Sequence, residues 1–312
     1  MGRCCLLLFV AYTTPWAQDL FPQDLSAGLK LIQAGRFHDA LEPLGRALVS
    51  RPAAFEPNYL LGLALSQDGR KVEAIRHLRV GQLAQPQHTG LLVMLGVLYL
   101  QEGYALDAAE TLEAAGRKAP LDEKPALLAA EAWHRCFRFD KALASARDTT
   151  ARFPQSADAK FRVGYELETA GRFDEAQSAF ANAVELRPDF VEARVALARL
   201  HLRFGRYESA RQHLQVALGA NSRHPQARLE LVKLSARRKE TVRARQLLEG
   251  LIAENDSEPE LHLLLSRVFQ DEGNAAGSAR ERERFQQLNR TEGAGGGMSG
   301  TVSSGKSRRF DE

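Results

Sequence analysis

Apolar residues recur along the chain at the spacing of an amphipathic helix, with polar residues between them. Leu91, Leu95, Leu98 and Tyr99, for example, fall on one face of a helix. Two such stretches follow one another in each segment of 34 residues, and the alternation typical of a half-buried strand is absent. The pattern therefore predicts an all-α protein built from helix pairs.

Glycine, alanine, proline and small residues repeat with the same period, which indicates an array of one small repeat without a single globular core. Each kind of position recurs every 34 residues or at a multiple of 34. The glycines are Gly35, Gly69, Gly103, Gly171, Gly205 and Gly273; the alanines are Ala40, Ala74, Ala108, Ala142, Ala176, Ala210 and Ala244; the prolines are Pro52, Pro86, Pro120, Pro154 and Pro188; the small residues ahead of the glycine position are Gly28, Gly62, Gly96, Ala130, Gly164 and Ala198.

Each of these positions has a physical role in a helix–turn–helix repeat. The glycine takes the left-handed backbone conformation that ends the first helix without a steric penalty. The alanine lets the second helix approach the first closely. The proline, which has no N–H to donate, ends the second helix. An aromatic residue two positions past the glycine (Phe37, Phe173 or Tyr207) begins the second helix with a bulky packing group.

This combination resembles the tetratricopeptide repeat family, whose 34-residue helix–turn–helix repeat carries the same small–Gly–Ala–Pro pattern. The resemblance runs in phase from Phe21 to Asn289 and is most complete in FRVGYELETAGRFDEAQSAFANAVELRPD. It implies a right-handed α-solenoid of about eight repeats in residues 21–289, with repeats starting near residues 21, 55, 89, 123, 157, 191, 225 and 259. Two repeats depart from the pattern, because Phe137 and Lys239 stand where glycine is expected and a side chain there makes a left-handed turn costly.

The two ends of the chain differ from the repeats. Residues 1–20 (MGRCCLLLFVAYTTPWAQDL) resemble a secretory signal peptide with cleavage after Ala17, so we expect export to the periplasm or the medium, or a cytoplasmic protein if the segment is retained. After cleavage Cys136 is the only cysteine, which excludes an internal disulfide. Residues 290–312 are rich in glycine and serine, and we expect them to be disordered.

No combination of residues in the sequence points to catalysis, a cofactor or a metal. Residues 300–307 read GTVSSGKS and match the phosphate-binding loop motif, but no strand precedes them and no helix can follow them. The eight histidines form no metal-binding motif, and no nucleophile–base pair is set by spacing. No segment approaches the roughly 20 apolar residues of a membrane-spanning helix. We therefore expect a non-enzymatic protein without a cofactor or a membrane span in the mature chain.

One charge asymmetry points to a binding surface. Residues 194–245 hold thirteen Lys or Arg and three acidic residues, whereas the whole chain carries a net charge of +3. By the family resemblance, the first helices of successive repeats line a concave groove. Residues that lie 34 positions apart or one helical turn further would then form its basic end: Arg199, Arg203, Lys233, Arg237 and Arg267. The corresponding apolar end would be formed by Leu29, Tyr59, Leu63, Val93, Val97 and Leu100.

These residues lead to the hypothesis of an interaction scaffold in the cell envelope or outside the cell. Its groove would bind a protein or peptide segment that is apolar at one end and acidic at the other. Two alternatives remain open. Self-association through the degenerate C-terminal repeats would give a homo-oligomeric assembly factor. Electrostatic nucleic-acid binding is disfavoured, because the basic segment holds few stacking aromatics beyond Phe204 and Tyr207.

Overall fold

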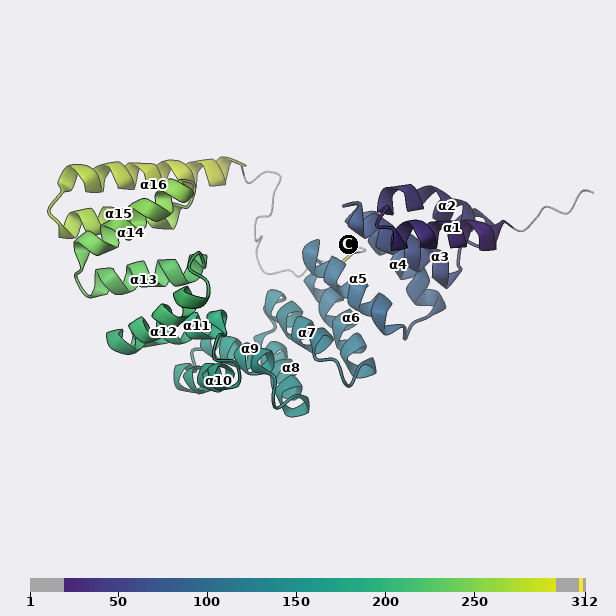
Figure 1. Cartoon of the computed structure of the whole chain (residues 1–312), viewed down its shortest axis with the longest axis horizontal. Helices are drawn as coiled ribbons and strands as arrows, with labels where there is room; N and C mark the ends of the chain where they lie inside the picture. Colours follow the sequence, from purple (N-terminus) through teal and green to yellow (C-terminus); the bar gives the residue numbers. More distant parts are fainter. Residues whose placement is uncertain (1–19, 296–308, 311–312) are drawn as a thin grey trace, which may run out of the picture. The chain divides into compact units, whose positions relative to one another are not determined.

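The computed structural model describes residues 20–295 and 309–310, and in these residues it contains sixteen α-helices and no strands (Figure 1). The chain divides between Lys118 and Ala119 into two compact units. The first unit holds α1 (Phe21–Gln33), α2 (Phe37–Ser50), α3 (Phe55–Gln67), α4 (Lys71–Ala84), α5 (Thr89–Gln101) and α6 (Ala105–Lys118). The second unit holds α7 (Lys124–Arg135), α8 (Phe139–Arg152), α9 (Ala157–Thr169), α10 (Phe173–Leu186), α11 (Val191–Arg203), α12 (Tyr207–Ala220), α13 (Pro225–Arg237), α14 (Thr241–Glu254), α15 (Pro259–Asp271) and α16 (Ala275–Gly295).

Within each unit the helices pack in chain order. Every odd-numbered helix packs against the even-numbered helix that follows it, and each pair packs against the next pair. This arrangement buries the apolar stripe of each helix against its neighbours. The prediction of an all-α solenoid built from helix pairs is therefore confirmed.

The turn between the two helices of a pair keeps one conformation even where the sequence departs from the pattern. The glycines of the turns have positive φ angles between 71° and 83°. Phe137 and Lys239, which stand at the same position in two other turns, both adopt a φ of 58°. The packing of the flanking helices thus imposes the left-handed conformation on residues that disfavour it.

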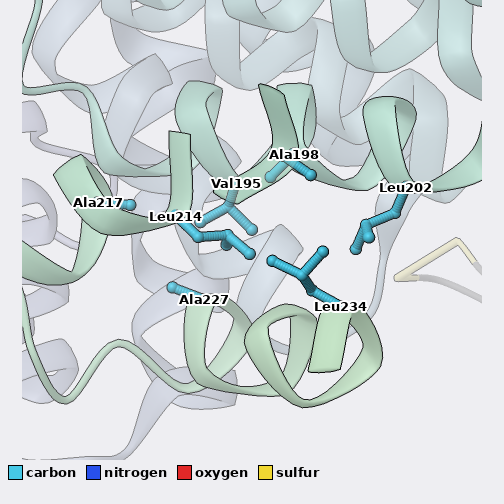
Figure 2. Packing of buried hydrophobic residues seen from close by; sticks show 8 residues of the cluster. Val195, Ala198, Leu202, Leu214, Ala217, Ala227 and Leu234 are labelled. Atoms are coloured by element: carbon cyan, nitrogen blue, oxygen red, sulfur yellow. The ribbon is translucent and has the colours of Figure 1, made fainter. Parts of the chain in front are cut away.

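Small residues on the first helix of a pair face large ones on the second. A Cβ atom added to Gly28, Gly62, Gly96 or Gly164 would lie between 2.4 and 2.6 Å from a side-chain carbon of the facing leucine or phenylalanine. The seven alanines of the repeat pattern are all fully buried. Figure 2 shows such a core, in which Ala198 of α11, Leu214 of α12 and Leu234 of α13 pack together.

In α3, α11 and α15, the first helices of three repeats, the side chain of the fourth residue forms hydrogen bonds with the loop before the helix. The repeat pattern did not predict these contacts. The side chain of Asn58 donates hydrogen bonds to the carbonyl oxygens of Pro52 and Ala54, both at 2.8 Å. Arg194 and His262 reach the carbonyl oxygen six residues before them in the same way, at 2.5 and 3.2 Å. These contacts satisfy backbone acceptors in the connection between repeats.

Helix α16 extends from Ala275 to Gly295, so its last residues belong to the segment that the sequence predicts as tail. The GTVSSGKS segment and the proposed signal peptide (residues 1–17) lie outside the described residues.

Candidate functional site

The five residues predicted to form the basic end of the groove all line one hollow in the second unit. Arg199 and Arg203 lie on α11, Lys233 and Arg237 on α13, and Arg267 on α15. The hollow has a volume of about 590 Å³. Its other lining residues are apolar or acidic: Leu202, Val232, Ala236, Leu264, Val268, Glu230, Glu260 and Asp271.

Two of the five cations are neutralised by carboxylates, so the hollow is less positive than the sequence predicted. Arg199 donates two parallel hydrogen bonds to Glu168 on α9, from Nε to Oε1 at 2.9 Å and from Nη2 to Oε2 at 2.5 Å. These bonds raise the pKa of Arg199 above its usual value. Lys233 Nζ lies 3.4 Å from Glu230 and 3.1 Å from Glu260. Two residues of the predicted positive row, Arg199 and Lys233, thus have carboxylate partners, whereas Arg267 does not among the described residues.

The other three cations carry the uncompensated positive charge of the hollow. The guanidinium carbon of Arg203 lies 4.1 Å from the centroid of the Phe173 ring, a cation–π contact that leaves its charge in place. Arg237 and Arg267 are exposed and have no carboxylate partner among the residues that the structure describes. Asp271 also lines the hollow, and it forms no ion pair with any of the residues that the structure describes. The hollow thus offers three available arginines beside an apolar wall.

The predicted apolar end lies in the first unit, where most of its residues form a half-exposed face. Leu29 on α1 is 40% exposed, and Tyr59, Leu63, Val93 and Val97 on α3 and α5 are half-buried. The Tyr59 ring is stacked on Phe55 at 5.5 Å, which fixes its orientation.

Leu100 was wrongly assigned to this face. It is only 7% exposed, because α5 is apolar around most of its circumference and buries seven of its thirteen residues.

The helix pair α11–α12, which carries Arg199 and Arg203, also contains two histidines. In each of them one ring nitrogen is buried and forms no hydrogen bond. His201 on α11 and His213 on α12 stack with their ring centroids 5.4 Å apart, and the Nδ1 atom of each is buried without a partner. Burial, followed by the neighbouring His201 and Arg194, lowers the pKa of His213 to about 4. Burial and Arg206 lower the pKa of His201. Both rings are therefore held neutral in the fold.

We expect the second unit to lose stability as the pH falls from about 6.5 to about 4. The unfolded chain binds protons at these histidines at a higher pH than the folded chain does, so protonation favours unfolding below about 6.5 and has no effect above it. The loss should be on the order of 2 kcal/mol, since partial solvent exposure weakens the effect. Urea denaturation at pH 7 and pH 5 measures it.

The matched variant is His213→Leu, which copies Leu247 at the same position of the next repeat. It should reduce the pH dependence of the urea midpoint. An unchanged pH dependence in this variant would assign the acid sensitivity to other groups.

Other chemical centres are not apparent in the part of the chain that the structure describes. That part contains no group of three or more His, Cys, Asp or Glu side chains able to hold a metal ion. It also contains no helix long and apolar enough to cross a membrane. Cys136 is buried and forms no disulfide, and His134 Nδ1 lies 2.8 Å from a carboxylate oxygen of the buried Glu166.

Three segments of the chain match family models described as tetratricopeptide repeats. Residues 25–88 match one model, and residues 167–221 and 205–268 match another. Together the segments cover about half of the chain. No curated protein shows significant sequence similarity to the chain.

Several solved structures are similar to this chain, and those with TM-scores of 0.62 include a tetratricopeptide repeat protein. One from Parabacteroides merdae ATCC 43184 is 16% identical, with a TM-score of 0.62 over 75% of this chain and 93% of that chain. The APC/C hetero-tetramer Cut9–Hcn1 gives 14% identity and a TM-score of 0.62, covering 88% of this chain and 54% of that chain. YrrB, described as a repeat protein with an unusual peptide-binding site, is 18% identical with a TM-score of 0.47, over 59% of this chain and 95% of that chain.

Proposed function

Because the chain belongs to the tetratricopeptide repeat family, we propose that it is an interaction scaffold whose hollow binds an acidic segment of a protein partner. The observation that carries this proposal is the convergence of Arg203, Arg237 and Arg267 in one hollow without carboxylate partners for their charges. Arginine binds carboxylates through two parallel hydrogen bonds, which favours recognition of Asp or Glu side chains.

The apolar wall supports a peptide as the ligand. Leu264 and Val268 lie beside the arginines, so aliphatic side chains next to the acidic residues of the partner can be buried there. The carboxylates Glu230, Glu260 and Asp271 also line the hollow. Glu230 and Glu260 pair with Lys233, and Asp271 pairs with no cation among the described residues. The hollow therefore suits a peptide with a few separate negative charges better than a continuous polyanion.

Arg199 and Lys233 have a different role in this proposal. Their charges are already paired with Glu168, Glu230 and Glu260, so they join neighbouring helices and shape the hollow. Reversing them would break contacts within the protein. The test of binding therefore uses the unpaired arginines.

We expect the double variant Arg237→Glu, Arg267→Glu to lose at least about tenfold in partner capture. Each charge-assisted hydrogen bond contributes about 1.5–3 kcal/mol, and the new glutamates would repel an acidic segment. The measurement is a quantitative crosslinking pulldown from the source cells with the purified chain, comparing the amount of each captured protein between variants.

The control is the double variant Arg223→Glu, Arg243→Glu. It changes the net charge by the same amount at exposed arginines of the same basic segment that do not line the hollow. Loss of a captured protein with the hollow variant alone, at equal helical content, supports the proposal. Equal loss with both variants would show non-specific attraction to a basic surface. Capture of the chain itself would favour self-association instead.

We also propose that the protein is exported through its N-terminal segment. The apolar run from Cys4 to Tyr12, followed by small residues up to Ala17, supports this. Mass spectrometry of the protein recovered from its source cells tests it. A mature chain that begins at Gln18 supports export, and a chain that retains residues 1–17 contradicts it.

A further inference from the structure

Four phenylalanines stand at three successive turns of the second unit, and three of these four residues are exposed. Phe137 and Phe139 lie at the turn between α7 and α8, Phe173 at the start of α10, and Phe204 at the end of α11. Phe137 is 54% exposed, Phe204 is 42% exposed and Phe139 is 38% exposed. We refer to Phe173 and Phe204, whose rings contact each other, as the aromatic edge.

The repeat fold does not require two of the exposed rings, those of Phe137 and Phe204. Phe137 occupies the glycine position with a φ of 58°, a left-handed conformation that is unfavourable for a bulky residue. Phe204 stands at a position that holds small or polar residues elsewhere: Ala34, Asp68, Glu102, Cys136, Ala170, Arg238 and Glu272. Helix packing therefore does not explain why aromatic rings are displayed here, whereas binding of a ligand would.

The aromatic edge is continuous with the hollow through Arg203. This arginine lines the hollow and at the same time lies over the Phe173 ring. Phe173 in turn meets Phe204 edge to face, with ring centroids 6.1 Å apart. Arg206 lies 5.6 Å from the Phe204 centroid. A partner peptide bound in the hollow can therefore contact the arginines and, with its next residues, the phenylalanine rings.

We propose that the aromatic edge binds a proline that adjoins the acidic residues of the partner segment, with Phe204 as the main contact. This inference rests on the proposed function of the hollow. Proline-containing segments are extended before binding, and aromatic-lined surfaces recognise them with little loss of conformational entropy. An extended chain is also the form in which successive residues can reach from Arg237 across Arg203 to Phe204.

A single-stranded nucleic acid is the competing ligand, because bases also stack on exposed aromatic and arginine side chains. A nucleic acid would place a continuous row of phosphates along the hollow, where Asp271 has no cation partner among the described residues and only three arginines have unpaired charges. A peptide with a few separate carboxylates fits this arrangement better.

The test uses two fluorescein-labelled peptides of nine residues. Both carry three glutamates, which are followed by two prolines in one peptide and by two alanines in the other. Fluorescence anisotropy measures their binding to the full chain, to Phe204→Ser, and to the control Val216→Ser. Val216 is a similarly exposed apolar residue on α12, and it does not line the hollow.

We expect the proline peptide to bind the wild-type chain about fivefold more tightly than the alanine peptide. Phe204→Ser should remove this difference and leave the affinity for the alanine peptide unchanged, whereas Val216→Ser should preserve the difference. Equal binding of the two peptides, with a loss of both in the Arg237→Glu, Arg267→Glu variant, would overturn the inference and leave the proposed function intact. No binding of either peptide would overturn the proposed function and the inference with it. Phe204-dependent binding of labelled oligothymidylate that displaces the peptides would favour nucleic acid.

Discussion

Replacement of Gly164 by valine is expected to destabilise the second unit by about 3 kcal/mol or more. A Cβ atom at this position would lie 2.6 Å from Cδ1 and 2.7 Å from Cε1 of Phe180, distances that real Cβ contacts do not reach. Phe180 is fully buried between α9 and its neighbours, so its rigid ring has no space into which it could move. The two methyl groups of valine would increase the overlap and force the helices apart.

Urea denaturation followed by circular dichroism measures this effect, and Gly250→Ala is the matched control. Gly250 lies inside α14 with no atom near its added Cβ, so alanine there should stabilise the helix by about 0.5–1 kcal/mol. Replacing a glycine inside a helix should thus lower the free energy of unfolding at position 164 and raise it at position 250. A small effect of Gly164→Val would mean that α9 and α10 can separate without loss of packing.

A compensating pair distinguishes close approach from a general intolerance of substitution. The next repeat pairs Ala198 with Leu214 at the positions of Gly164 and Phe180. We expect the combination Gly164→Ala, Phe180→Leu to be less destabilising than the sum of the two single changes, because leucine makes room for the added methyl group. Strict additivity would contradict a direct contact between the two side chains.

Replacement of Asn58 by leucine is expected to destabilise the first unit by about 3 kcal/mol. Asn58 is 1% exposed, and its amide donates to two carbonyl oxygens of the loop between α2 and α3. It also contacts His77 Nδ1 at 3.2 Å. Leucine has a similar volume but no donor, so the two carbonyl oxygens would lose their side-chain hydrogen bonds.

The control for this variant is Gln67→Leu, a change of amide to leucine at an exposed position of the same helix. Its effect on the free energy of unfolding should stay within about 0.5 kcal/mol. Because the two variants remove an amide of the same kind, their difference isolates the contribution of the buried hydrogen bonds. Equal effects on thermal unfolding would exclude that contribution.

The fold could be predicted from the sequence because its determinants are local and repeat at fixed positions. Gly171, Ala176 and Pro188 mark the turn, the close contact and the helix end within a single repeat. The left-handed turns at Phe137 and Lys239 show that helix packing overrides the local preference where the marker residue is missing. The marker residues of each repeat therefore determine its local structure, and packing against neighbouring helices maintains that structure where a marker residue is missing.

The candidate site could be predicted only in part, because its electrostatics depend on residues from different repeats. Arg199, Lys233 and Arg267, which the sequence spaces 34 residues apart, line one hollow. The spacing did not show that Glu168 and Glu260, each about one repeat away from its partner, neutralise two of these cations. The aromatic edge was missed for a related reason, since Phe173 and Phe204 come from separate turns and meet only after the helices have stacked.

The packing of helices in chain order has a mechanical consequence. Among the described residues, each repeat within a unit is held mainly by the repeats directly before and after it, and the main helix contacts do not join the two ends of a unit. Tension applied along the chain can therefore detach the outermost helix pair while the inner pairs stay folded. Such a protein is expected to unfold one helix pair at a time under tension, and the detached pairs can refold onto the remaining pairs when the tension is released.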